Sequence, residues 1–519
     1  MAVPKFKNEQ VLDFTKPANR KKQAETIAKL RSELGKEYPI VINGERVFTS
    51  RKLNSINPSR TDEIIGVFQS GDAVLANKAM EAATAKFAEW KNVPAKKRAD
   101  YLFKAAKLMR KKRFECNAAM IIEVGKSWPE ADADTAEAID FLEFYAREML
   151  RYGTEQSVVK VKGEKGKLVY IPLGVGVVVP PWNFALAILT GMTSAAVVAG
   201  NTVVLKPSSD SPFTGWKFLE IMEEVGLPAG VINFVTGPGG EVGDTLIKHP
   251  QTRFVSFTGS KEVGIHINQE AAKVQPGQRW LKRVVAEMGG KDSIVVDETV
   301  DLEDAATGVT ASAFGFQGQK CSACSRVIVA EKVYDKFVGL LAKKANALTI
   351  GDPADQRNYM GPVINRKAQE NILRYVETGV REGGRVVAGG DRAGEAGCFV
   401  RATVIADVDP KATISQEEIF GPVLAVIKAR DFDHALEIAN NTEFGLTGAV
   451  YTKNKKRLKK AEEEFFVGNL YFNRKCTGAL VGAHPFGGFN MSGTDSKAGG
   501  KDYLLLFLQA KSIAEKIKR

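Results

Sequence analysis

The sequence predicts an α/β protein with two mainly parallel sheets. Helical patterns come first, because apolar residues recur at helical spacing before residue 110, as in Met80, Ala83, Phe87 and Trp90. After about residue 165, short apolar strands alternate with segments of helix length, which is typical of parallel sheets. The strands expected are 231–235, 254–257, 293–296 and 327–330. One sheet is predicted on each side of about residue 288.

The segment 168–205 contains no charged residue and is long enough to span a bilayer. Pro172, Pro180 and Pro181 interrupt any single helix across it. Runs of β-branched residues at 177–179 and 203–204 flank an alanine-rich stretch. The segment therefore predicts a strand, a helix and a strand inside an α/β protein, and no membrane helix.

Charge and length restrict the classes of function. A chain of 519 residues has the length of two or three domains. The net charge of +12 comes from Lys and Arg residues that are spread along the chain and mixed with Asp and Glu, which argues against a nucleic-acid partner. The densest charged run, 453–464, has basic residues before acidic ones at helical spacing, so it predicts a solvated helix face.

The five cysteines do not form the pattern of a disulfide framework, because they are an odd number scattered over a long chain. The first ten residues also lack the apolar core of a signal peptide, so a cytoplasmic location is predicted. The four histidines are isolated in sequence, and no metal site is expected. The pair Cys321 and Cys324 leaves a thioredoxin-like site open as a second interpretation.

Cys321 is the candidate nucleophile. It follows the glycine-rich segment 314–320 (FGFQGQK) and precedes the predicted strand 326–330. Backbone N–H groups in such a segment, together with the neighbouring Lys320, favour a thiolate. A buried structural cysteine is the alternative interpretation.

Five further segments resemble the aldehyde dehydrogenase superfamily in their order and spacing. They are 181–184 (PWNF), 257–260 (FTGS), 287–291 (EMGGK), 318–321 (GQKC) and 417–422 (EEIFGP). The strict dinucleotide motif G-x-G-x-x-G is absent, as expected for this family's variant of the dinucleotide fold, because Gly237, Gly239 and Gly243 are spaced by one residue too many. The resemblance covers nearly the whole chain.

The resemblance implies an aldehyde dehydrogenase-like fold with three parts. A variant Rossmann dinucleotide-binding domain is expected at 1–150 and 173–287, and an α/β catalytic domain at 288–489. A small β oligomerisation extension is expected at 151–172 and 490–519. The apolar segment 504–513 is a strand candidate that completes a sheet elsewhere, with another subunit as one option. A homodimer or dimer-based homo-oligomer is the implied assembly.

The chemistry of aldehyde oxidation explains why these residue types occur. Hydride leaves a tetrahedral thiol adduct much more easily than a free carbonyl, so a nucleophile is needed. By resemblance, Cys321 attacks the aldehyde, and the Asn183 amide and the Cys321 N–H hold the oxyanion. Glu287 matches the base that activates water against the thioester. The alternative for Glu287 is a solvated charge at a helix end.

The resemblance also implies NAD as cofactor, with NADP accepted. Lys206 matches the lysine that bonds the adenosine ribose, and Ser209 stands where NAD-preferring relatives often carry Glu, so a 2′-phosphate is not repelled. The remaining implied contacts are Ser260 and Gly243 at the pyrophosphate, Val263 at the adenine, Glu418 at the nicotinamide ribose, and Trp182 and Phe420 near the nicotinamide. The alternative for these two aromatic residues is an ordinary core position.

The loop 473–479 (NRKCTGA), followed by 485–489 (PFGGF), resembles the anchor loop of the L-glutamate γ-semialdehyde dehydrogenase subfamily, which acts on opened 1-pyrroline-5-carboxylate. The implied substrate is therefore an amino acid with an aldehyde tail. Its carboxylate is assigned to Ser322 and the N–H groups of Gly478 and Ala479, its ammonium to Glu137, and its chain to Phe184 and Phe486. The alternative for this loop is an ordinary turn.

The resemblance thus implies NAD(P)-dependent oxidation of L-glutamate 5-semialdehyde to L-glutamate through a thiohemiacetal and a thioester at Cys321. A dehydrogenase for another semialdehyde, such as succinic semialdehyde, is the alternative among enzymes. A non-catalytic scaffold of the same fold is disfavoured because both Cys321 and Glu287 are present.

Overall fold

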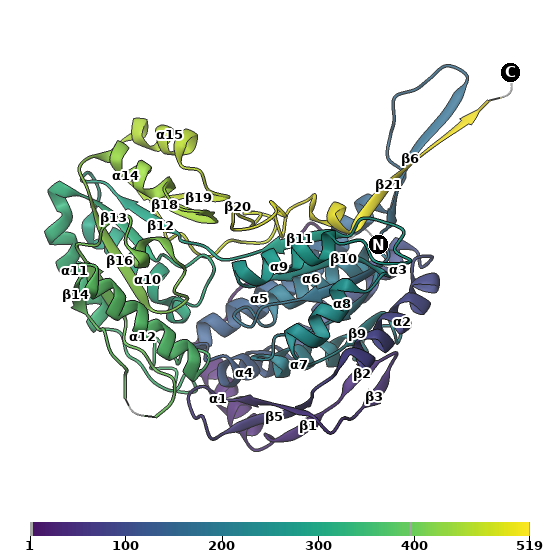
Figure 1. Cartoon of the computed structure of the whole chain (residues 1–519), viewed down its shortest axis with the longest axis horizontal. Helices are drawn as coiled ribbons and strands as arrows, with labels where there is room; N and C mark the ends of the chain where they lie inside the picture. Colours follow the sequence, from purple (N-terminus) through teal and green to yellow (C-terminus); the bar gives the residue numbers. More distant parts are fainter. Residues whose placement is uncertain (1–3, 395, 518–519) are drawn as a thin grey trace.

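The computed structural model describes residues 4–394 and 396–517, which form two lobes and a projecting arm (Figure 1). A large sheet lies at the centre of each lobe. The prediction of one mainly parallel sheet on each side of residue 288 is confirmed.

The first lobe is built on a seven-stranded sheet with the order β11-β10-β7-β8-β9-β2-β3. Its strands are β2 (Ile40–Ile42), β3 (Glu45–Val47), β7 (Val175–Val179), β8 (Thr202–Leu205), β9 (Ile232–Phe234), β10 (Thr252–Thr258) and β11 (Arg283–Glu287). All pairs from β11 to β9 are parallel, whereas β2 and β3 run antiparallel at one edge. The chain order reverses between β7 and β10. Their carboxyl ends are therefore the switch point where open α/β sheets bind ligands.

Helices cover both faces of this sheet, because consecutive strand residues belong to different cores. Val178 packs with the helices α3 to α7, whereas Val177 packs with α2, α8 and α9. The helices of this lobe are α1 (Pro17–Arg31), α2 (Ala73–Trp90), α3 (Ala95–Lys111), α4 (Arg113–Glu123), α5 (Trp128–Tyr152), α6 (Ala187–Val198), α7 (Pro212–Glu224), α8 (Asp244–Lys248) and α9 (Lys261–Ala272). A small sheet of β1 (Lys36–Tyr38), β5 (Ile64–Gln69) and β4 (Lys52–Ile56) lies beside them.

The uncharged segment 168–205 folds as predicted, since β7, α6 and β8 follow one another within it. Most residues of these three elements are buried. In the part of the chain that the structure describes, no helix has both the length and the apolar character needed to cross a bilayer.

The second lobe contains another seven-stranded sheet, with the order β14-β15-β16-β13-β12-β18-β19, in which only β14 is antiparallel. Its strands are β12 (Ser293–Val296), β13 (Arg326–Ala330), β14 (Arg385–Ala388), β15 (Thr403–Ala406), β16 (Val423–Ala429), β18 (Thr447–Tyr451) and β19 (Asn469–Phe472). Its helices are α10 (Leu302–Phe314), α11 (Tyr334–Asn346), α12 (Arg366–Arg381), α13 (Thr413–Gln416), α14 (Phe432–Asn440) and α15 (Lys455–Glu464). In α15 only Ala461 is buried, which confirms the predicted solvated helix face.

The carboxyl ends of the strands in the first sheet face the amino ends of the strands in the second sheet. Residues 288–292 join the carboxyl end of β11 directly to the amino end of β12. Cys321 precedes β13, and Glu418 and Phe420 precede β16, so these residues lie at the amino edge of the second sheet. That edge faces the carboxyl ends of β7, β8 and β10, where Asn183, Lys206 and Ser260 follow their strands.

The arm consists of β6 (Glu164–Pro172) and β21 (Leu508–Lys516), which pair antiparallel over their full length and project from the first lobe (Figure 1). The predicted strand 504–513 is wrong in its first residues, because Tyr503–Phe507 forms a 3-10 turn. Leu504 and Phe507 are buried in the core of the first lobe, and this burial anchors the turn before the strand begins. β21 pairs with β6 of its own chain. The three-domain division stays a prediction.

Candidate active site

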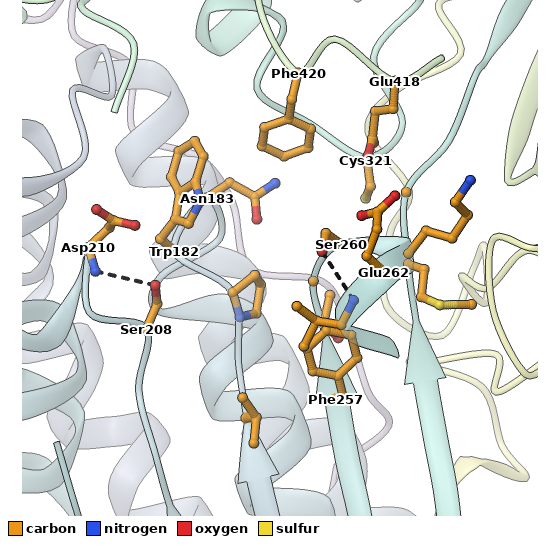
Figure 2. Close-up of a pocket in the computed structure, with 18 of the residues that line it drawn as sticks. Trp182, Asn183, Ser208, Asp210, Phe257, Ser260, Glu262, Cys321, Glu418 and Phe420 are labelled. Carbon is orange, nitrogen blue, oxygen red and sulfur yellow. Dashed lines mark hydrogen bonds between the residues drawn. The ribbon is translucent and has the colours of Figure 1, made fainter. Parts of the chain in front are cut away.

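A cleft of about 860 Å³ lies at the switch point of the first sheet. Figure 2 shows Trp182 and Asn183 from the first lobe opposite Phe420 and Cys321 from the second. The predicted cofactor residues that line the cleft are Trp182, Lys206, Ser209, Ser260, Val263, Glu418 and Phe420. Gly243 is not among the lining residues. It is buried at one end of the π-helical turn Gly239–Gly243, while Gly239, at the other end, lines the cleft.

Lys206 is a buried cation that lacks a strong partner. Its Nζ bonds only the Pro207 carbonyl oxygen, at 3.4 Å, among the residues described by the structure. Burial lowers the pKa of Lys206 to about 8. A hydroxyl or phosphate oxygen in the cleft would satisfy this ammonium group, so the site fits a nucleotide.

The amino end of α9 also suits an anionic ligand. Ser260 caps this helix, and its side chain accepts a hydrogen bond from Val263 N at 3.4 Å (Figure 2). Both residues line the cleft. The unpaired N–H groups and the dipole at a helix amino end favour phosphate. The geometry is therefore compatible with the predicted pyrophosphate position.

Glu418 and Phe420 line the same cleft from the second lobe. Glu418 Oε1 accepts a hydrogen bond from Gly290 N at 3.1 Å, and a Cβ atom on Gly289 would collide with this carboxylate. Phe420 has a φ of 57°, which is unfavourable for a bulky residue, and its ring meets Trp182 edge-on at 5.5 Å. Such strain is common where a site requires one side-chain position.

A second, mostly apolar cavity adjoins the cleft. All six predicted substrate residues line it: Glu137, Phe184, Ser322, Gly478, Ala479 and Phe486. Glu287 lines it as well. Cys321, Thr258 and Met288 line both the cleft and the cavity. The predicted nucleophile therefore lies where the two spaces meet.

The structure corrects one expectation about Cys321. Lys320 does not act on the thiol, because its Nζ pairs with Glu130 Oε1 at 2.8 Å and Oε2 at 2.9 Å. Burial raises the pKa of the Cys321 thiol well above its ordinary value, and the charges of Asp292, Glu418 and Glu287 raise it further. The Ser322 N–H opposes this effect and lowers the pKa of the thiol. The isolated site therefore favours the thiol over the thiolate.

Two donors lie beside Cys321. The Asn183 side chain is buried and donates one of its two amide hydrogens to the Gln319 carbonyl oxygen at 3.0 Å. This bond leaves the second hydrogen for a ligand. The Cys321 N–H bonds no acceptor within the described residues. The pair is compatible with the predicted oxyanion site.

Glu287 ends β11 rather than a helix, so the alternative of a solvated helix-end charge is wrong. Its Oε1 accepts a hydrogen bond from the Ser496 hydroxyl, and its Oε2 is buried without a partner among the described residues. Burial raises the pKa of Glu287 to about 7, although Ser496 and Lys497 oppose the shift. A carboxyl group with this pKa is suited to general base catalysis near neutral pH.

The anchor loop offers free donors to the cavity. Gly478 has a φ of 80°, and within the chain as described neither its N–H nor that of Ala479 is donated to a protein acceptor. Ser322, from the nucleophile segment, lines the same cavity. Burial and the neighbouring Asp134 raise the pKa of Glu137 to about 8. These groups match the needs of a carboxylate and an ammonium group on one ligand.

Sequence reasoning missed several residues around the site. Lys126 is fully buried, pairs with Asp134 at 2.5 Å and lies 4.3 Å from the centre of the Phe184 ring. Tyr145 and Tyr503 line the cavity. Ser496 bonds the Glu287 carboxylate. Ser496 lies outside every sequence motif given above, the nearest being 485–489.

Comparison with known proteins gives one consistent result. The Aldehyde dehydrogenase family profile matches residues 47–513. The chain belongs to the aldehyde dehydrogenase family. Within this family, a Geobacillus sp. (strain WCH70) protein named 1-pyrroline-5-carboxylate dehydrogenase is 57% identical over 513 residues, covering 99% of each chain. The protein of that name from Bacillus subtilis (strain 168) is 53% identical over 510 residues, covering 98% of this chain and 99% of that protein.

Solved structures of family members agree with these relatives. A crystal structure described as 1-pyrroline-5-carboxylate dehydrogenase from Thermus with bound NAD superimposes with a TM-score of 0.97 at 48% identity. It covers 99% of this chain and 100% of that one. The aldehyde dehydrogenase-like fold predicted from the motifs is therefore confirmed.

Proposed function

We propose that this aldehyde dehydrogenase oxidises L-glutamate 5-semialdehyde, the opened form of 1-pyrroline-5-carboxylate, to L-glutamate with NAD as oxidant. The observation that carries this proposal is the position of Cys321, which lines both a nucleotide-sized cleft and an apolar cavity with carboxylate donors. The similarity to 1-pyrroline-5-carboxylate dehydrogenases over the full chain supports it. Breakdown of proline is the metabolic context that this reaction implies.

The reaction begins when the thiol of Cys321 gives its proton to solvent water and its sulfur bonds the aldehyde carbon, whose oxygen takes the electron pair of the C=O double bond. The resulting oxyanion is stabilised by the Asn183 amide and the Cys321 N–H. NAD supplies the acceptor for the hydride that leaves this carbon, and the product is a thioester on Cys321. Glu287 then removes a proton from water, which attacks the thioester and releases L-glutamate and the thiol.

The substrate's polar end is held in the cavity by groups of complementary charge. Ser322 and the N–H groups of Gly478 and Ala479 replace water around its carboxylate. Its ammonium group lies near Glu137 and lowers the pKa of that carboxyl group. Phe184 and Phe486 contact the aliphatic chain between the two ends.

Substrate choice tests this proposal. We expect kcat/KM for L-glutamate 5-semialdehyde to exceed that for aliphatic aldehydes, which lack a carboxylate, and for succinic semialdehyde, which carries one a carbon nearer to the aldehyde. Unpaired donors in the cavity cost about 1 to 3 kcal/mol, or roughly 5- to 150-fold. Ser322→Ala should reduce turnover of the amino-acid aldehyde and weaken inhibition by L-glutamate, with little effect on aliphatic aldehydes.

Ser325→Ala is a matched control, because the Ser325 hydroxyl is buried nearby and does not line the cavity. Reduced nicotinamide absorbance measures every rate. A higher kcat/KM for succinic semialdehyde than for the amino-acid aldehyde would refute the carboxylate site, while the proposed Cys321 chemistry could stand.

Ser209 is proposed to let the enzyme use NADP as well as NAD. We expect Ser209→Glu to reduce kcat/KM with NADP at least about tenfold, because a carboxylate near a 2′-phosphate is repelled by about 1 to 4 kcal/mol per pair of charges. Activity with NAD should change little. Ser209→Gln is the control, because glutamine has nearly the same size as glutamate but carries no charge. Equal losses with both cofactors would show that Ser209 does not face the ribose.

A homodimer or dimer-based oligomer and a cytoplasmic location complete the proposal. The arm of β6 and β21 projects with the exposed apolar residue Ile171, and the exposed Ile517 directly follows it, which supports contact with another subunit. All five cysteines are free, as in reducing compartments. Light scattering of the purified protein would measure the size of the assembly.

A further inference from the structure

Ser496 contacts the proposed base, and none of the steps above uses it. Its hydroxyl donates a hydrogen bond to Glu287 Oε1, although the two residues are 209 positions apart in the sequence. Ser496 is buried, with 4% of its surface exposed. The other carboxylate oxygen, Oε2, has no partner in the described chain. Ser496 is thus the side chain that holds Glu287 within the described part of the protein.

The backbone around Ser496 is held in an unfavourable conformation. Asp495 has a φ of 53° and Lys497 a φ of 41°, so Ser496 lies between two left-handed residues that are not glycine. Such conformations persist only where the surrounding structure holds them, and they cluster at functional sites. Lys497 Nζ provides one restraint, because it donates to the carbonyl oxygens of Gly468 and Gly487, both at 2.7 Å.

Two glycines leave room for the carboxylate at this place. A Cβ atom on Gly487 would lie 3.1 Å from Glu287 Oε1, and one on Gly493 would lie 3.2 Å from Oε2. Gly493 also forms a β-bridge with Glu287. The carboxylate therefore occupies a slot between Gly487 and Gly493, where the Ser496 hydroxyl is the side-chain group bonded to it and the Gly488 N–H also favours its charged form.

We propose that Ser496 is a positioning residue whose hydroxyl holds the Glu287 carboxylate, in its ionised form, in the slot between Gly487 and Gly493. This inference rests on the proposed role of Glu287 as the base. A hydroxyl that donates to a carboxylate stabilises the charged form and favours one of its positions. Ser496 therefore keeps the base ready for deacylation and has no part in hydride transfer.

The charges around Glu287 agree with this role. Burial raises the pKa of Glu287 to about 7, and the Ser496 hydrogen bond is the largest effect in the opposite direction. Lys497 also lowers the pKa of Glu287. The other titratable groups that interact with Glu287 are the Cys321 thiol and the Tyr503 hydroxyl, and each becomes harder to ionise beside a carboxylate.

Replacement of the hydroxyl tests the proposal. Without Ser496 the pKa of Glu287 rises, and the base is ionised only at higher pH. In Ser496→Ala, we expect the pH midpoint of deacylation to rise by about one unit, which makes deacylation at pH 7 roughly fivefold slower. The burst of reduced cofactor should keep its rate and size, because hydride transfer precedes the action of Glu287. Stopped-flow absorbance measures the burst and the steady state on the same sample.

Matched variants separate the hydroxyl from simple structural effects. Ser496→Thr and Ser496→Val have equal size, and only the threonine variant should keep the original midpoint. Thr494→Val removes the Ala286 N–H bond to Thr494 Oγ1 at 3.0 Å, next to Glu287, without touching its carboxylate. An unchanged midpoint in Ser496→Ala and Ser496→Val, or an equal shift in Thr494→Val, would overturn the proposal. If the deacylation rate of Glu287→Gln still rose with pH through the same midpoint, the assignment of Glu287 as the base would be wrong.

Discussion

Replacement of Cys321 by alanine is expected to abolish aldehyde oxidation while the enzyme still binds NAD. The change removes the attacking sulfur atom and little volume. No thiohemiacetal then forms, so there is no adduct from which hydride can be transferred. The expected loss of kcat is at least on the order of a thousandfold, as for other covalent nucleophiles. Titration of the variant with NAD, followed by intrinsic fluorescence, should give a Kd close to that of the wild type.

Cys324→Ala is the matched control, because Cys324 lies in the same segment and is buried, whereas Cys321 is half-buried at the cleft. Its Sγ is directed to the Arg326 carbonyl oxygen at 3.2 Å, and it lines neither the cleft nor the cavity. Loss of this side chain should lower the free energy of unfolding by on the order of 1 kcal/mol and leave kcat nearly unchanged. The opposite outcome for the two cysteines would show that the nucleophile of this segment is assigned to the wrong residue.

The fold was predictable because its signals are local. Short apolar runs such as 293–296 appear as strands at the predicted positions, and the uncharged segment 168–205 folds as the predicted strand, helix and strand. The end of the chain was less predictable. Leu504 and Phe507 have the apolar character of a strand, but burial in the core of the first lobe holds them in a turn. Tertiary packing overrides local propensity at such places.

Most of the predicted site residues line the cleft or the cavity, with Gly243 as an exception, but the electrostatics of the site was not predictable. Motif positions identified the residues that meet at the two cavities, since parallel strands bring their ends to one edge. The direction of a long side chain is not encoded in such motifs. Lys320 is adjacent to Cys321 in sequence, yet its ammonium group lies at Glu130. The opposite holds for Ser496, which is distant from Glu287 in the sequence but donates a hydrogen bond to its carboxylate in the folded chain.

Glu287→Gln is expected to stop the reaction after one turnover. The variant can still form the adduct and transfer hydride, since neither step requires this carboxylate in the proposed sequence. Hydrolysis of the thioester should slow by roughly 10²- to 10⁴-fold, because glutamine cannot accept a proton from water. One equivalent of reduced cofactor per active site should appear in a burst. Mass spectrometry of the quenched protein should locate a glutamyl adduct on Cys321.

The pH dependence of the same reaction gives an independent check on Glu287. A base must be ionised to act, and burial raises the pKa of Glu287 to about 7, so deacylation in the wild type should increase as the pH rises through about 7 and then level off. Glutamine does not titrate, so the slow residual deacylation rate of Glu287→Gln should not rise with pH in this range. A variant with neither burst nor adduct would place Glu287 at an earlier step, as the group that removes the proton from the Cys321 thiol.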